Sequence, residues 1–224
     1  MKKYIILDFG KVLAYPTTGN WDITPKFLEL IDINKIDMNK LKEIRKKYSS
    51  ILSEKVETLE EEYDMFKRFY DGILKEYNLK NYKTEIAEQI AYDRTYNHNK
   101  YTLYPNIEEE LNLLKENYTL ILLSDNWPSA LPYMKDNNIY NYFDKIYISS
   151  IYGQEKKDGL FFDNPIKDFN IKKGEAIFID DNESLLDIAV TKGLDVRLMD
   201  REKDINSSKY KIISNLYEIN EFKS

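Results

Sequence analysis

Polar residues with oxygen-bearing side chains end three short apolar runs of the chain. They are Asp8 after residues 4–7, Ser124, Asp125 and Asn126 after residues 119–123, and Asp180, Asp181 and Asn182 after residues 176–179. Carboxylate oxygens are the ligands that a hard divalent cation prefers, and an ionised aspartate can also act as a nucleophile. One aspartate after a strand is ordinary turn chemistry, but three such endings predict one shared site.

The three apolar runs are predicted to be strands of one parallel sheet. Each run lacks a polar break, as a strand buried on both faces requires, and helical segments separate the later runs. Strands that alternate with helices form parallel βαβ units, and ligands bind at the edge where the carboxyl ends of the strands meet. With further strands expected at residues 145–148, 196–199 and 210–213, the predicted fold class is α/β, a doubly wound, Rossmann-like parallel sheet.

Residues 16–99 are predicted to form an all-helical cap subdomain, inserted after the first strand. A helix start is expected at residues 24–25, where a threonine precedes a proline. Residues 58–61 fit a capping box, and an apolar stripe at intervals of three and four residues follows them. The core is therefore predicted to comprise residues 1–15 and 100–224.

The segment between the first strand and about Tyr118 shows no strand signal. Residues 14–21 are rich in Pro, Thr, Gly and Asn and are expected to form a loop. Within this loop, Asn20 and Trp21 are candidates either to line the cap side of the site or to anchor the loop.

The composition indicates a soluble globular protein and excludes several kinds of site. The 224 residues are 42% hydrophobic and 32% charged. The net charge of −6 argues against nucleic acid and anionic membranes as partners, but not against a small phosphorylated molecule. With no cysteine and one histidine, the chain has no thiolate and no multi-histidine metal site. No apolar run is long enough to span a bilayer or to form a signal peptide, so a cytoplasmic location is expected.

Four segments, in order, resemble the motifs of the haloacid dehalogenase-like (HAD) hydrolase superfamily. They are residues 4–13, 120–126, 152–158 and 177–182. The third resembles the pattern Gly-x-x-Lys-Pro-Asp, with Lys157 where proline is usual. The resemblance covers nearly the whole chain, and the helical insertion is similar to the C1-type cap of this superfamily.

The resemblance implies a nucleophile and a metal site. Asp8 would attack a phosphate and form an aspartyl-phosphate, which splits one displacement into two easier ones. Mg²⁺ would be the cofactor, because attack on an anion by an anion requires charge neutralisation. Its implied ligands are Asp8, the Gly10 carbonyl and Asp181, with Asp180 acting through water or as an orienting group.

The resemblance also implies residues that bind the phosphoryl group. Ser124 would donate its hydroxyl to a phosphoryl oxygen, and Lys156 would hold the same group as a point charge. The alternative for Lys156 is a solvated surface lysine. Asp125 and Asn126 would either bind substrate or cap the following turn.

Two positions depart from the superfamily pattern. Gly10 stands where phosphatases usually carry a second aspartate as general acid and base. The resulting Asp-x-Gly-x-Val-Leu form resembles a sugar-phosphatase-like branch, and haloacid dehalogenases also lack the second aspartate. Leu185 stands where a polar residue usually follows the motif, and Asp187 is expected on a different face of that helix.

The leading expectation is a Mg²⁺-dependent phosphomonoester hydrolase that acts on a small phosphorylated metabolite such as a sugar phosphate. Two alternatives stay open: a 2-haloacid dehalogenase, in which Asp8 attacks carbon without a metal, and a non-catalytic HAD-like binding protein. The adjacent carboxylates of Asp180 and Asp181 favour a cation and therefore the phosphatase. The protein is expected to be a monomer or a homodimer.

Overall fold

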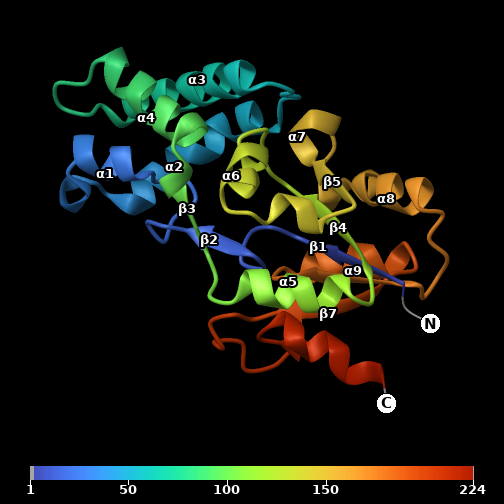
Figure 1. Ribbon diagram of the computed structural model, residues 1–224. Coiled ribbons are helices and arrows are strands. Elements are labelled where there is room, and N and C mark those ends of the chain that lie inside the picture. Colours follow the sequence, from blue (N-terminus) through green and yellow to red (C-terminus); the bar gives the residue numbers. More distant parts are fainter. Residues whose placement is uncertain (1–2, 224) are drawn as a thin grey trace.

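The computed structural model describes residues 3–223, and a six-stranded parallel sheet forms its centre (Figure 1). The strands of this sheet are β1 Tyr4–Leu7, β4 Thr119–Ser124, β5 Lys145–Ile148, β6 Ala176–Asp180, β7 Asp195–Met199 and β8 Ile212–Ile213. Their order across the sheet is β5-β4-β1-β6-β7-β8, and every neighbouring pair is parallel. The predicted α/β fold class is confirmed.

Strand register brings the predicted polar endings to one level. Leu7, the last residue of β1, is paired with Leu122 of β4 on one side and with Ile179 of β6 on the other. The residues that follow in each strand therefore emerge side by side at the carboxyl edge of the sheet.

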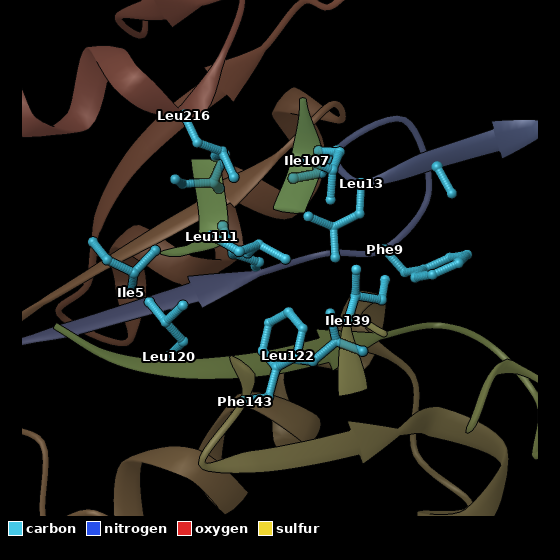
Figure 2. Packing of buried hydrophobic residues seen from close by; sticks show 14 of the residues in the cluster. Ile5, Phe9, Leu13, Ile107, Leu111, Leu120, Leu122, Ile139, Phe143 and Leu216 are labelled. Atoms are coloured by element: carbon cyan, nitrogen blue, oxygen red, sulfur yellow. The ribbon is translucent and has the colours of Figure 1, made fainter. Parts of the chain in front are cut away.

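Alternate residues of the central strands pack into two separate cores, one on each face of the sheet. Ile5, Leu120 and Leu122 belong to the core that Figure 2 shows, in which they pack with Leu111 and Leu216. Their neighbours Ile6, Ile121 and Leu123 belong to the core on the opposite face. The helices that follow β3 are α5 Ile107–Lys115, α6 Ala130–Asp136, α7 Ser149–Tyr152, α8 Asp163–Asp168 and α9 Glu183–Thr191.

Residues 25–96, here called the helical lobe, contain four helices with a hydrophobic core of their own (Figure 1). The helices are α1 Pro25–Leu30, α2 Met38–Tyr48, α3 Leu59–Tyr77 and α4 Thr84–Tyr96. The predicted starts are present: the Thr24 side chain caps α1 with Pro25 in its first turn, and Thr58 and Glu61 form a capping box. Across the described residues, no helix is both long and apolar enough to cross a membrane. The exact domain boundaries stay a prediction.

The prediction that no strand lies between the first strand and Tyr118 was wrong. A two-stranded antiparallel sheet joins β2 Ala14–Pro16 to β3 Tyr101–Leu103, where the chain enters and leaves the helical lobe. Strands of three residues are too short to show an alternating pattern. Pro16 in addition favoured the prediction of a loop, because proline is uncommon within strands. Short 3₁₀ segments complete the fold: Ile33–Lys35, Ser49–Ser53, His98–Lys100, Tyr140–Tyr142, Lys156–Asp158, Leu160–Phe162 and Leu216–Lys223.

Candidate active site

Three carboxylates, here called the carboxylate cluster, converge at the carboxyl edge of the sheet. Asp8 follows β1, Asp180 ends β6 and Asp181 comes directly after it. One oxygen of each lies within 4.8 Å of one oxygen of the others. The Asp8 backbone N–H donates to the Ile179 carbonyl at 3.0 Å, which continues the β1–β6 ladder into the site. Residues more than 170 positions apart are thus joined by strand register alone.

Lys156 is buried against this cluster and is not a solvated surface lysine. Its ammonium donates to Asp180 Oδ2 at 2.6 Å and lies 2.9 Å from Asp8 Oδ1 as an ion pair. The segment reaches the site because Gly153 takes a left-handed conformation (φ 63°) and ends α7. Burial on its own would lower the pKa of Lys156, but Asp180 and Asp8 outweigh burial and raise it.

The three carboxylates of the cluster outnumber the two lysines that pair with them, Lys156 and Lys11. Burial raises the pKa of Asp180 to about 7, and burial together with Asp8 raises the pKa of Asp181. Within the described part of the chain, Asp8 Oδ1 is buried and accepts no hydrogen bond. An all-oxygen, electron-rich set of this kind fits a hard divalent cation.

The motif residues Ser124, Asp125 and Asn126 lie at the carboxyl end of β4, at the same edge of the sheet as the cluster. Ser124 is buried as the last residue of β4. Asp125 Oδ1 accepts the backbone N–H of Lys156 at 3.0 Å. The Asp125 residue is exposed overall, but burial of its carboxylate raises the pKa of this group to about 6. Asn126 Oδ1 accepts the Trp127 backbone N–H at 2.9 Å, so Asn126 caps the following turn while it also borders the site.

A cavity of about 300 Å³ opens beside the carboxylates. Its lining comes from the sheet edge through Asp8, Asp125 and Asp181, and from the helical lobe and its connection through Trp21, Arg45 and Arg94. Ser124, Lys156 and Asp180 do not contribute to this lining. A larger cavity of about 450 Å³ lies against the helical lobe. Asn20 lines it, but none of the residues predicted to act as nucleophile, metal ligand or phosphoryl-binding group does, so we place the site at the smaller cavity.

Trp21 occupies the space beside Gly10. A Cβ atom on Gly10 would lie 3.2 and 3.3 Å from two carbons of the indole ring. An aspartate at position 10 would therefore require the ring to move. Trp21 lines the cavity, whereas Asn20 accepts the Asp22 backbone N–H at 2.9 Å and anchors the loop.

Asp187 does not replace the polar residue that is missing at position 185. The Asp187 carboxylate accepts from the Tyr210 hydroxyl and pairs with Lys209 at 2.7 Å. These partners hold Asp187 away from the carboxylate cluster, as expected from its place on the helix.

Sequence reasoning missed three cations of the cavity wall: Lys11, Arg45 and Arg94. Arg45 is paired with Asp22. Lys11, in a left-handed conformation with φ 54°, places its ammonium 3.6 Å from Asp181 Oδ2. Arg94 is buried in the last turn of α4. A signal for Arg94 was present, because it continues the buried stripe of Ala87, Ile90 and Ala91 at helical spacing.

Comparisons with known proteins agree with this fold. The sequence profile of the haloacid dehalogenase-like hydrolases matches residues 5–199, whereas none of the curated proteins matches the chain. The HAD-hydrolase YfnB of Bacillus subtilis, solved with bound magnesium and showing interdomain movement, is 15% identical with a TM-score of 0.67, over 98% of this chain and 97% of that one.

Two dehalogenase structures are similar to the same degree. The 2-haloacid dehalogenase of Pseudomonas syringae pv. Tomato is 17% identical with a TM-score of 0.66, over 99% of this chain and 97% of that one. The L-2-haloacid dehalogenase of Xanthobacter autotrophicus is 12% identical with a TM-score of 0.69, over 99% and 98%. At these identities the likeness shows a shared fold.

Proposed function

Because the chain belongs to the haloacid dehalogenase-like hydrolase family, we propose that this enzyme is a Mg²⁺-dependent phosphomonoester hydrolase of a small phosphorylated metabolite. The observation that carries the proposal is the convergence of Asp8, Asp180 and Asp181 within 4.8 Å. A nucleophile that displaces halide from carbon requires one carboxylate, whereas adjacent carboxylates are costly without a cation.

Asp8 is the proposed nucleophile. When bound by Asp8 and Asp181, with Asp180 and the Gly10 carbonyl in support, Mg²⁺ would neutralise and orient the phosphate. An oxygen of Asp8 attacks phosphorus, and the bond from phosphorus to the leaving oxygen breaks with its electron pair. Because Gly10 offers no proton, the leaving oxygen takes one from water. A second water then attacks phosphorus, which releases inorganic phosphate and a proton and restores the Asp8 carboxylate.

Lys156 and Ser124 are the proposed phosphoryl-binding groups. The buried ammonium of Lys156 forms an ion pair with Asp8 and would stabilise the charge that develops on the phosphoryl oxygens. Asp125 holds the Lys156 backbone in place, and Ser124 would donate its hydroxyl to a phosphoryl oxygen.

Gly10 and the helical lobe support a finer assignment. The Asp-x-Gly form of the first motif, with Trp21 beside Gly10, supports the sugar-phosphatase-like branch. The lobe, within the predicted cap at residues 16–99, supplies Arg45 and Arg94 to the cavity wall as a C1-type cap would.

Phosphate release tests the proposal. The enzyme is incubated with Mg²⁺ and a broad panel of phosphomonoesters, and inorganic phosphate is measured. Release that requires Mg²⁺ and is abolished by Asp8→Asn is the expected result. No release from any member of the panel, or release that Asp8→Asn leaves unchanged, would overturn the proposal.

The second candidate is a 2-haloacid dehalogenase. The absence of an acid at position 10, where Trp21 fills the space, favours it, and two of the similar structures are dehalogenases. In this reaction Asp8 attacks carbon, halide leaves with the electron pair, and water hydrolyses the ester. Halide release from 2-chloropropionate in the presence of a chelator would establish this activity. Metal binding without either turnover would instead identify a non-catalytic binding protein.

A further inference from the structure

Arg94 places a buried positive charge in the wall of the site cavity. Its residue is 5% exposed, and it lines the same cavity as Asp8 and Asp181. An arginine side chain stays protonated and carries five N–H donors. A charge buried to this extent is normally paired, because leaving it unpaired costs free energy.

No protein acceptor satisfies these donors. Within residues 3–223, the Arg94 guanidinium makes no hydrogen bond and no ion pair. Three aromatic rings surround it instead, with its central carbon 5.1 Å from the ring centre of Phe66, 5.6 Å from Trp127 and 5.7 Å from Tyr101. Rings stabilise the faces of a guanidinium, but they give its N–H edges nothing to donate to.

Glu62 and Asp22, whose charges act on Arg94, and its sequence neighbour Asp93 are engaged by other groups. Glu62 accepts from Ser129 and lies 4.0 Å from Lys100, Asp22 pairs with Arg45, and Asp93 accepts from the Lys26 backbone and from Asn97. None of these carboxylates forms an ion pair with Arg94 within the described residues. The charge of Arg94 is thus left for a molecule that enters the cavity.

Trp127 supplies a second donor at the same place. Its indole Nε1 is buried and has no hydrogen-bond partner among the described residues. The Trp127 residue lines the cavity, and its ring is one of the three around Arg94. A buried N–H without an acceptor is uncommon in a native structure. A group with two anionic oxygens would accept from both Arg94 and Trp127.

We propose that Arg94 and Trp127 form a subsite for a second anionic group of the substrate. The substrate is then a phosphomonoester whose leaving group carries a carboxylate or a second phosphate, and this inference rests on the proposed function. The reacting phosphate lies at Asp8 and Lys156, and the second anion lies at Arg94. The cavity of about 300 Å³ is at the lower end for small-molecule sites, which suits a short carbon chain.

Calorimetric binding to the Asp8→Asn protein with Mg²⁺ tests the subsite without turnover. Phosphoglycolate, ethylene glycol bisphosphate and 2-hydroxyethyl phosphate share a two-carbon chain, and only the last lacks a second anion. We expect one or both of the probes with a second anionic group to bind about 10- to 100-fold tighter than 2-hydroxyethyl phosphate, as a charge-assisted hydrogen bond allows. The better of the two identifies the second group as carboxylate or phosphate.

Variants then assign the preference to its residues. Arg94→Met in the same background is expected to abolish the preference, and Trp127→Phe to reduce it by a smaller factor. Arg68→Met is the matched control and is expected to retain it, because this lobe arginine pairs with Glu54 on the surface, outside the cavity lining. If Arg94→Met does not fold, Trp127→Phe decides alone.

The outcomes separate this inference from the proposed function. Equal affinity for all three probes, no binding of any probe, or a preference that survives the decisive variant would overturn the subsite. A lowered melting temperature in Arg94→Met with the preference intact would show a purely structural cation. If the preference behaves as expected but the wild-type enzyme releases no phosphate from any probe, the hydrolase proposal fails and the subsite stands.

Discussion

The protein buries two groups of charged side chains, and they are built in opposite ways. In the carboxylate cluster, two lysines, the buried Lys156 and the exposed Lys11, face three aspartates. An oxygen of Asp8 has no hydrogen bond within the described residues. In the second group, here called the Glu62 cluster (Glu62, Lys100 and Ser129), the Lys100 ammonium donates to Ser129 Oγ. The Ser129 hydroxyl and backbone N–H both donate to the Glu62 carboxylate.

This difference in how far the buried charges satisfy one another distinguishes a binding site from a purely structural contact between the lobe and the sheet. Glu62 belongs to α3 of the helical lobe, and Ser129 precedes α6 beside the sheet, so the Glu62 cluster fastens the lobe to the sheet through groups that satisfy one another. The carboxylate cluster requires a further positive charge, which the described residues do not supply. Buried polar groups are stabilising when their network is complete, and an incomplete network indicates a missing ligand.

Asp8→Asn is expected to have the largest effect, because it removes the nucleophile from the incomplete cluster. We expect kcat for phosphate release to fall by at least about 10³-fold, since an amide oxygen is a poor nucleophile. Steady-state phosphate release measures this, with Asp187→Asn as the control, because Asp187 is paired with Lys209 outside the site. A kcat of the Asp8→Asn variant within tenfold of the wild-type value would mean that Asp8 does not attack the substrate.

Breaking the complete cluster should affect stability more than chemistry. Burial lowers the pKa of Lys100 to about 7, so Glu62→Gln, which removes its counter-charge, leaves Lys100 neutral and the buried network incomplete. We expect the free energy of unfolding to fall by about 1–3 kcal/mol. Denaturant unfolding measures this. Glu60→Gln, at an exposed position of the same helix, is the control and should change stability by less than about 0.5 kcal/mol. A similar loss in both variants would show that Glu62 is not part of a structural contact between the lobe and the sheet.

Magnesium should stabilise the protein more as pH rises. The raised pKa values of Asp180, about 7, and of Asp181 mean that the folded state holds protons that the unfolded state has lost. Without metal, their contribution to stability therefore falls as pH rises from about 4 to about 7. Protons also compete with the metal, so the rise in melting temperature caused by Mg²⁺ should be larger at about pH 8 than at about pH 6.

The same melting experiment has a direct control. Asp181→Asn should remove most of the Mg²⁺ effect at the higher pH, because it removes a carboxylate of the cluster. An equal shift at both pH values, or a shift that survives Asp181→Asn, would contradict a metal site in this cluster.

Gly10→Ala is expected to have the smallest effect. The added Cβ would lie 3.2 Å from the Trp21 ring, and we expect a cost of about 1 kcal/mol in the free energy of unfolding. Trp21→Phe should relieve part of this cost in the double variant, as a double-mutant cycle measures. Additive effects of the two substitutions would show that the ring does not limit position 10.

The sheet and the carboxylate cluster could be predicted from the sequence, and the Glu62 cluster could not. Unbroken apolar runs define buried strands locally, and parallel topology then brings Asp8 and Asp180 together. The family that the ordered motifs suggested is confirmed. The contact of Glu62 with Ser129 spans 67 residues and depends on how the lobe docks, which helical periodicity does not encode. Arg94 was missed because only the apolar stripe of α3 was identified from the sequence, and the shorter stripe of α4 that contains Arg94 was not.

A single turnover in ¹⁸O-labelled water tests the role of Asp8 most directly. The enzyme is mixed, in excess and with Mg²⁺, with a phosphomonoester substrate that it hydrolyses, and the reaction is quenched after one turnover. Mass spectrometry then measures the label in the released phosphate and in the peptide that contains Asp8. Attack of water on the phosphorus of an aspartyl-phosphate predicts label in the phosphate and none in Asp8. Label in the Asp8 carboxylate would contradict the account, because it would mean that water attacks the carbonyl carbon of an ester, as in the dehalogenase reaction.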